Sequence, residues 1–467
     1  MSMPFMRSAK PRRILAAVLT LLALSLPSLG QTQPDPQKEQ LLNGLPLLFW
    51  IKPGAPEVII KLRIHSGAAF DLAGRAGEMA LLGDLLFPDR ATIDYFTEMN
   101  GRLEVRVNYD SMTITLEGRA TEFDRIIEVL RNALLATQLT PEVVARVRES
   151  RTKIVRETVI SPATLADRAI ASRLFGDFPY GRPWAGSVED LARVDRPDLM
   201  LARDRFLNPN NATLAIWGGA DKARSMRTLR QLLGAWRKSE QIVPTTFRQP
   251  SPPDVRTLVI GGPAPSTEVR LAVRGVARSD GDFGAAVVLA KIAQHRWETQ
   301  DPALTQKPVF VRSESHVLPG MFVMGVTINN DSVVGTLASA RKALDSLVTS
   351  PPTTTELERA KGETIAEILG VLSKPDGLVE SWLEVDTYRL ASINDQLTAL
   401  HSLSAPAVQA VASRLFKDAS VASVAVGDPQ QLKTALQGHV QFEVLGEITA
   451  PPPPPKPAVK PSGVPTP

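Results

Sequence analysis

The feature that most constrains the fold is an internal repeat that spans the chain. Residues 206–208 (Phe-Leu-Asn) precede an apolar segment at 212–217 and then two glycines, and residues 415–417 (Leu-Phe-Lys) precede a similar segment at 421–426 and then Gly-Asp. Phe206 and Phe416 lie 210 positions apart. Because this period is far longer than that of a solenoid repeat, it predicts two domains of the same fold within one chain.

Each half mixes strand and helix patterns without strict alternation. Residues 58–64 are predicted to form a strand, and residues 103–107 and 111–117 form a hairpin with its turn at 108–110. A helix with a period of about 3.6 residues follows. Its apolar stripe consists of Phe123, Ile126, Ile127, Leu130 and Leu134. This order predicts an α+β fold: two homologous sandwich domains, each an antiparallel sheet packed by helices.

Changes in composition divide the chain into segments. Prolines gather at residues 249–254, and nine of the seventeen residues from Pro451 to Pro467 are proline, which is typical of an extended tail without a core. The predicted segments are a signal peptide (1–30), a polar lead-in (31–40), a first domain (41–245), a linker (246–256), a second domain (257–448) and a Pro-rich disordered tail (449–467).

The N-terminus has the layout of a secretory signal. Arg7, Lys10, Arg12 and Arg13 precede a largely apolar run at residues 14–26, and small residues follow. The run is short for a bilayer span, although an uncleaved N-terminal anchor is the alternative. We therefore expect a secreted, periplasmic protein whose mature chain has no transmembrane anchor.

Composition excludes several kinds of chemistry. The chain has no cysteine, which rules out thiol nucleophiles, disulfides and cysteine-based metal sites. Its five histidines all lie more than twenty residues apart, so no local two-histidine metal motif exists. Four cations of the signal segment account for the formal charge of +4. A mature chain near neutrality gives no reason to expect nucleic-acid binding.

Several motifs of the first half resemble those of insulinase/pitrilysin-type peptidases. The segment FPYGRPWAGS at residues 178–187 is similar to the family's HPYGRPxxGS segment. Residues 42–45 (LNGL) resemble its opening LxNGL strand, and residues 211–219 (NATLAIWGG) resemble the closing strand of its first domain.

The second half resembles the same family. Residues 269–271 and 282–283 fit the opening of its second domain. Residues 319–322 (PGMF) are similar to a later xPGxF strand, and residues 358–361 (ERAK) fit an ELxxAK helix. Motifs in this order and spacing cover roughly residues 40–440.

The family's chemistry depends on a helical HxxEH motif, in which two histidines bind Zn²⁺ and the glutamate is the general base. Here that position falls on Ala80, Gly83 and Asp84, so both histidines and the glutamate are absent. A further zinc-binding glutamate on a later helix corresponds to Lys153 or Ile154. The resemblance therefore predicts no catalytic residues and no metal or other cofactor in this chain.

The family also holds the substrate backbone with an arginine and a tyrosine of its second half. Phe310 stands at the tyrosine position, and no arginine lies between Arg296 and Arg312. A phenyl ring packs on a peptide but donates no hydrogen bond. Phe310 is the one substrate-binding residue that the resemblance indicates.

The resemblance implies a proteolytically inactive subunit of a heterodimeric zinc peptidase. An HxxEH-bearing homologous subunit would be the partner and would hold the zinc, while this chain would enclose and bind an extended peptide substrate by strand addition to a sheet edge. Two alternatives stay open: an extracytoplasmic peptide-binding or scaffold protein that acts alone, and an active metalloendopeptidase with displaced zinc ligands.

Overall fold

The computed structural model describes residues 32–159, 161–240, 247–262 and 266–445. The predicted signal peptide and Pro-rich tail lie outside these residues. The chain divides into a short unit, Met1–Pro34, and a body, Asp35–Pro467, to which everything below refers.

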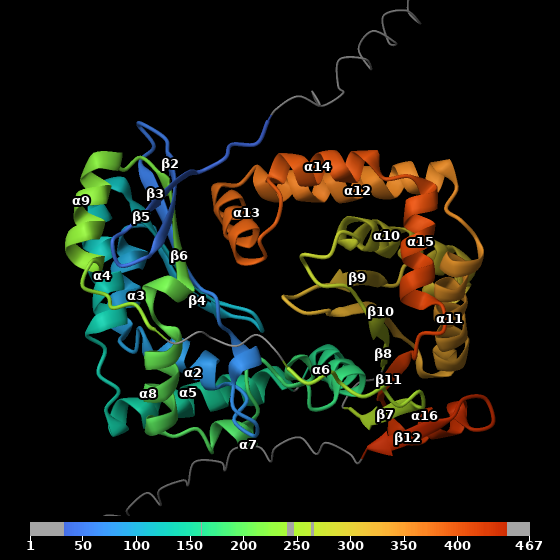
Figure 1. Cartoon of the computed structure of the whole chain (residues 1–467). Coiled ribbons are helices and arrows are strands. Elements are labelled where there is room, and N and C mark those ends of the chain that lie inside the picture. The colour runs from blue at the N-terminus through green and yellow to red at the C-terminus, as the bar shows by residue number, and fades with distance from the viewer. Residues whose placement is uncertain (1–31, 160, 241–246, 263–265, 446–467) are drawn as a thin grey trace, which may run out of the picture. The chain divides into compact units, whose positions relative to one another are not determined.

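Two sets of elements with the same order build the body (Figure 1). The first half consists of β1 (Gln37–Gln40), β2 (Pro46–Ile51), β3 (Glu57–Ile64), α2 (Glu78–Leu85), α3 (Arg90–Glu98), β4 (Arg102–Val107), β5 (Met112–Arg119), α4 (Phe123–Leu135), α5 (Pro141–Val159), α6 (Pro162–Phe175), η3 (Pro179–Gly181), α7 (Val188–Leu191), α8 (Arg196–Phe206), β6 (Ala212–Gly218) and α9 (Lys222–Leu233). The second half consists of β7 (Thr257–Gly261), β8 (Thr267–Arg274), α10 (Phe283–Gln300), β9 (Phe310–Glu314), β10 (Met321–Ile328), α11 (Val333–Thr349), α12 (Thr354–Leu372), α13 (Pro375–Thr387), α14 (Ile393–Ser402), α15 (Ala405–Phe416), β11 (Ala422–Gly427), α16 (Pro429–Leu436) and β12 (Phe442–Leu445).

Five strands of each six-stranded sheet follow the same order, which confirms the predicted duplication, whereas the sixth is the first strand of the chain in one sheet and the last in the other. The first runs β1-β2-β6-β3-β5-β4 and the second runs β12-β7-β11-β8-β10-β9. Strand β1 lies within the predicted polar lead-in and pairs with β2. Strands β4 and β9 are the equivalent edge strands of the two sheets.

The sheets are mixed rather than wholly antiparallel, which corrects one detail of the predicted fold. Strand β2 pairs with β6 in parallel, and β7 pairs in parallel with both β11 and β12. Each closing strand returns to the sheet only after a long helical excursion, and such a crossover allows parallel pairing. The α+β class with two duplicated domains is confirmed.

Strand alternation separates an apolar face from a partly charged face. In β3, Ile60, Leu62 and Ile64 pack against the helices of their own half, whereas Lys61 and Arg63 point to the opposite face. The charged face is covered by a helix from the other half of the chain.

The halves exchange one helix each. Helix α6 of the first half contacts β8 and β11, and helix α13 of the second half contacts β3 and β6 (Figure 1). The apolar part of the α13 contact buries Leu378, Val379, Trp382 and Leu383 against Leu48, Ile59, Ala215 and Trp217. The α6 contact buries Ala166, Ala169, Ile170 and Leu174 against Leu258, Ile260, Ala272, Val424 and Val426.

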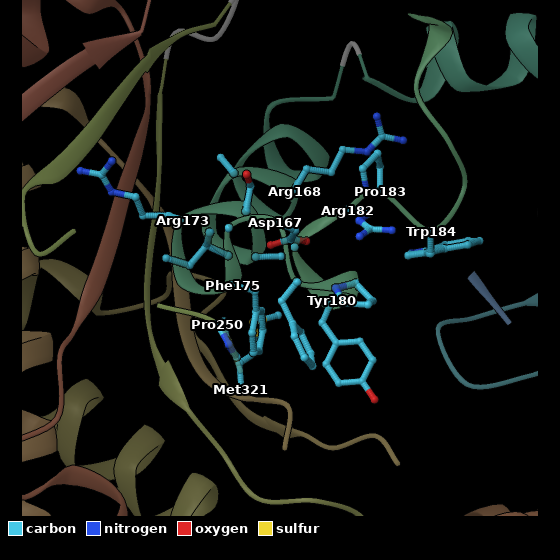
Figure 2. Close-up of a pocket in the computed structure, with 18 of the residues that line it drawn as sticks. Asp167, Arg168, Arg173, Phe175, Tyr180, Arg182, Pro183, Trp184, Pro250 and Met321 are labelled. Carbon is cyan, nitrogen blue, oxygen red and sulfur yellow. The ribbon is translucent and has the colours of Figure 1, made fainter. Parts of the chain in front are cut away.

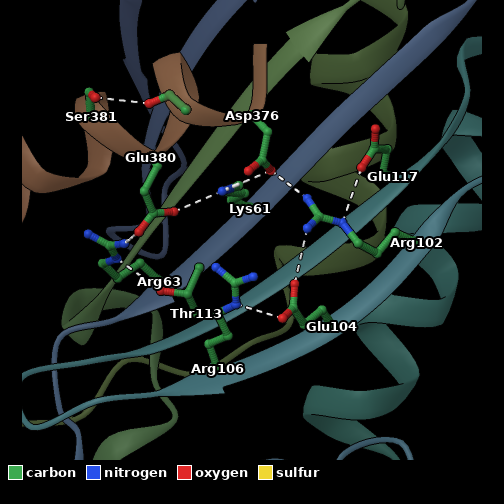
Figure 3. Close-up of polar contacts among 11 residues, drawn as sticks. Lys61, Arg63, Arg102, Glu104, Arg106, Thr113, Glu117, Asp376, Glu380 and Ser381 are labelled. Carbon is green, nitrogen blue, oxygen red and sulfur yellow. Dashed lines mark hydrogen bonds and ion pairs between the residues drawn. The ribbon is translucent and has the colours of Figure 1, made fainter. Parts of the chain in front are cut away.

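Each exchanged helix also neutralises a buried cation on the sheet that it covers. Lys61 Nζ lies 2.8 Å from Glu380 and 3.1 Å from Asp376, and Arg63 donates to Glu380 as well (Figure 3). In the other half, Arg270 Nε donates to Asp167 at 2.6 Å. Glu380 and Asp167 are each the sixth residue of their helix, so the ion pairs follow the duplication.

Burial acts to raise the pKa of Glu380, but the charges of Arg63 and Lys61 outweigh it and hold this pKa below its usual range. Glu380→Gln would leave two buried cations with only Asp376. We expect it to lower the free energy of unfolding by about 2 kcal/mol, between the values typical of buried and of surface pairs. Chemical denaturation would measure this loss. Glu128→Gln, which removes the exposed pair with Arg125, is the matched control and should cost less than about 0.5 kcal/mol. Equal effects would contradict the structural role of Glu380.

His65, at the end of β3, faces the C-terminal end of α13. Its Nε2 lies 2.9 Å from Thr213 Oγ1, whose hydroxyl donates to Asp386, so Nε2 carries the proton of the neutral ring. Nδ1 is buried without a partner. Burial, opposed by Asp386 and assisted by Arg63, lowers the pKa of His65 to about 4.

Below pH 6.5, His65 is protonated in the unfolded chain but stays neutral in the folded chain. This difference lowers the free energy of unfolding as the pH falls. Its contribution to the free energy of unfolding should decrease by about 2 kcal/mol between pH 7 and pH 5. His65→Gln should remove that part of the pH dependence in denaturation curves, while the exposed His401→Gln should keep it. A His65→Gln variant with the wild-type pH dependence would show that the folded ring titrates normally.

Candidate functional site

The start of α2 is held by the side chain of Asp71 and by the FPYGRPWAGS segment. Asp71 is buried and accepts the backbone N–H groups of Gly77 and Met79 at 2.7 and 2.9 Å. Burial outweighs these bonds and raises the pKa of Asp71 to about 8. Gly77 has a φ of 95°, and a Cβ there would lie 2.7 Å from Gly186 Cα. The close approach of these two glycines fixes the FPYGRPWAGS segment against α2.

Helix α2 carries the three residues at the family's HxxEH position. Ala80 and Gly83 are buried, and a Cβ at Gly83 would lie 3.0 Å from the Val105 side chain of edge strand β4. Arg151 of α5 donates to both carboxylate oxygens of Asp84, at 2.7 and 2.6 Å, and to the carbonyl oxygen of Ala80 at 3.4 Å. A guanidinium group therefore occupies the space between the two helices.

The later helix supplies no further acid to this position. Lys153 is exposed and lies 4.0 Å from Glu157, and Ile154 is 51% exposed beside a cavity. Zinc needs three protein ligands at a catalytic site. An alanine, a glycine and an ion-paired aspartate do not fit that ion. Across the described ranges, no three His, Asp or Glu side chains come together as a metal site.

Phe310 lies on edge strand β9, between two guanidinium groups. The centre of its ring is 4.9 Å from Arg270 and 4.2 Å from Arg312. The ring also covers Gly325 of β10, where a Cβ would lie 2.2 Å from it. The phenyl group is thus held by cation–π contacts with its own sheet.

A buried carboxylate that the sequence did not single out joins the two halves. Asp110, in the β4–β5 turn, is 4% exposed and accepts the hydroxyl groups of Tyr180 and Tyr388 at 3.1 and 3.0 Å. It also accepts the backbone N–H of Val317 at 3.0 Å, and His316 Nδ1 lies 3.4 Å away. Burial, with the charge of Asp110, raises the pKa of both tyrosines. The sequence places Asp110 in a turn and Tyr180 in a motif, but only the fold brings them together.

A cavity of about 1310 Å³ lies beside α6 and the inner face of the second sheet (Figure 2). Its walls come from α6, from η3 and the residues that follow it, from residues 247–254 and from strands β9 and β10. The volume exceeds the roughly 300–1,000 Å³ typical of small-molecule sites. Residues 249–254, predicted to be a linker, are therefore part of a concave surface.

The cavity combines aromatic rings with arginines. Trp184 is 47% exposed on its lining, where Phe175, Phe178 and Tyr180 are more buried. Figure 2 shows Arg168, Arg182 and Trp184 around Pro183. An exposed aromatic ring beside cations is the kind of surface that binds peptides.

Comparisons with known proteins agree with this fold. Residues 193–363 match the family described as the peptidase M16 inactive domain. An uncharacterized zinc protease of Rickettsia felis is 18% identical over 208 residues, which are 43% of this chain and 50% of that protein. The chain thus spans about half the length of this curated relative.

Solved structures share the fold at low sequence identity. The peptidase M16 inactive domain from Pseudomonas fluorescens superposes with a TM-score of 0.75 at 17% identity, over 85% of this chain and 98% of that one. The periplasmic protease PqqL from Escherichia coli superposes with a TM-score of 0.71 at 14% identity, over 87% of this chain and 49% of that one. This chain therefore corresponds to about half of the Escherichia coli protein.

The Arg151–Asp84 pair predicts how a grafted zinc site would behave. In a variant with Ala80→His, Asp84→His and Ile154→Glu, the Arg151 cation should keep zinc binding weak. Adding Arg151→Ala should tighten binding about tenfold or more, because a like charge within a few ångströms of the metal is removed. Adding Lys153→Ala instead is the control, since that side chain is exposed on the same helix. Titration with a chromophoric zinc chelator would measure both, and equal affinities would contradict the blocking role of Arg151.

Proposed function

From the match of residues 193–363 to the peptidase M16 inactive domain, we propose that this chain is an inactive member of the insulinase/pitrilysin-type peptidases and a subunit of a two-chain zinc peptidase. In this role it binds an extended peptide and closes the reaction chamber, while a homologous subunit with an HxxEH motif holds the zinc and cleaves.

The Arg151–Asp84 ion pair is the observation that carries the proposal. A partly buried guanidinium paired with a carboxylate lies between α2 and α5, the helices that correspond to those carrying the family's zinc ligands. A Cβ at Gly83 would lie 3.0 Å from Val105 Cγ1, so a glutamate there would require the Val105 side chain to shift by a few tenths of an ångström. At the position of the missing zinc ligands, the chain therefore has an ion pair and a close glycine contact that need no metal.

Two features support peptide binding. Strands β4 and β9 are sheet edges whose backbone groups on one side have no strand partner within the described residues. An extended peptide adds to such an edge through main-chain hydrogen bonds. Arg312 and Glu314 of β9 also line the cavity beside α6, so a peptide bound there would meet both an edge strand and a concave wall.

Secretion to the periplasm belongs to the same proposal. It is supported by the cationic and apolar order of residues 1–30 and by the periplasmic location named for the Escherichia coli PqqL protein. None of the helices in the described part of the chain has the length and apolarity needed to cross a membrane.

Reconstitution with an HxxEH-bearing homologue from the same organism tests the proposal. Residues 31–450 should form a 1:1 complex with it that buries more than roughly 1,000 Å². Proteolysis by the homologue should fall sharply when this chain is omitted, because an open chamber holds a peptide poorly against the metal. Size-exclusion chromatography and a quenched-peptide assay would measure both effects. A chain that keeps residues 451–467 should pair equally well.

Two results would overturn it. A homologue that is fully active alone and forms no complex would favour a scaffold that acts without a protease. One tightly bound zinc per chain, with chelator-sensitive proteolysis by this chain alone, would mean an active peptidase with displaced ligands.

A further inference from the structure

The cavity beside α6 contains more positive charge than its own carboxylates neutralise. Arg173 lies 3.2 Å from both Asp254 and Glu443, and Arg312 lies 3.5 Å from Glu314. These arginines are therefore paired within the walls. Two others are not.

Arg168 of α6 has neither a hydrogen bond nor an ion pair within the described chain, although it is partly buried. Its neighbour in sequence, Asp167, is already bound to Arg270. Burial lowers the pKa of Arg168, but a guanidinium group stays charged at any physiological pH. Removing such a charge from water without an anion is unfavourable.

Arg182 donates only to backbone carbonyl oxygens, those of Asp71 and Asp177, each at 3.0 Å. These bonds fix the position of the side chain and leave its charge without a carboxylate. Tyr109 is related to both cations: its hydroxyl donates to the Arg182 carbonyl oxygen, and burial raises the pKa of this phenol against the opposing charge of Arg168. Asp177, on the exposed rim of the cavity, is the nearby acid without an ion pair.

We infer that this cavity binds peptides through a carboxylate, which Arg168 and Arg182 receive beside the exposed ring of Trp184. The ligand class is thus an acidic peptide, whose carboxylate comes from an aspartate or glutamate side chain or from the peptide's C-terminus. This inference rests on the proposed peptide-binding role and adds to it a charge preference. The bound carboxylate would supply the anion that Arg168 lacks.

Peptide binding to the isolated chain tests the inference. The probes are short peptides of alanine, glutamine and serine, capped at both ends, with two central residues that are aspartate, asparagine or lysine. A fourth peptide has asparagine at these positions and a free C-terminal carboxylate. Trp184 would serve as the reporter in a Trp50→Phe background, because Trp50 is partly exposed whereas Trp217, Trp236, Trp297 and Trp382 are at most 5% exposed. Fluorescence titration would be checked by calorimetry.

We expect the aspartate peptide, the free-acid peptide or both to bind about tenfold more tightly than the capped asparagine peptide, as one charge-assisted hydrogen bond would give. The peptide that shows this gain identifies the source of the carboxylate. In Arg168→Gln, the affinity for that peptide should lie within about threefold of the affinity for the capped asparagine peptide. Arg119→Gln, an exposed arginine at the end of β5 and outside the cavity, should change nothing.

Arg168→Gln should fold normally because the side chain has no partner to lose, and thermal unfolding would confirm this. Should it fail to fold, Trp184→Ala at the exposed rim tests the same site and should weaken all peptides together. Equal affinity for all four peptides, or an unchanged charge preference in Arg168→Gln, would overturn the inference. Complex formation with the zinc-bearing homologue is measured separately, so pairing without charge preference would reject this inference alone.

Discussion

Lys61 and Arg270 hold equivalent places on the central strands of the two sheets, and the arrangement of the halves depends on neutralising them. Each cation is nearly inaccessible to water, with 3% and 2% of its surface exposed. Neither can be neutralised by its own outer helices, which lie on the apolar face. The exchanged helices supply acids to both, Glu380 and Asp376 of α13 to Lys61 and Asp167 of α6 to Arg270, which also pairs with Glu268 of its own strand. Separating the halves would take both acidic partners from Lys61 and one from Arg270, and would uncover the apolar residues that pack under the exchanged helices.

The same exchange creates the surfaces on which function would depend. Helix α6 packs on the second sheet with one side and lines the large cavity with another, so the contact that joins the halves also forms the cavity wall. Asp110 adds a second connection between the halves, because it accepts the hydroxyl groups of Tyr180 from the first half and Tyr388 from the second. Because both the exchanged helices and the Asp110 hydrogen bonds join the halves, we expect the two halves to form a rigid wall of a chamber rather than a mobile lid.

The segment from Ala80 to Asp84 shows how α2 and α5 are joined in this chain without a metal. Helices α2 and α5 still contact each other, and Arg151 and Asp84 satisfy each other where a metal and its ligands would otherwise join them. Glycine at position 83 lets the helix approach the edge strand closely. The fold therefore depends on contacts that do not require zinc, which accounts for its persistence in a chain without the motif.

The sequence by itself determined the duplication, the α+β class, the β4–β5 hairpin and the absence of the HxxEH residues. All of these depend on local periodicity or on residue identity, which the chain displays directly. It did not reveal the parallel pairs of the sheets, because a parallel partner is chosen by a distant crossover. Nor did it reveal the partners of Lys61 and Asp110, which lie 319 and 278 positions away. Only the tertiary structure decided these contacts, and with them the unpaired charge of Arg168, because burial and pairing depend on which distant segments share a face.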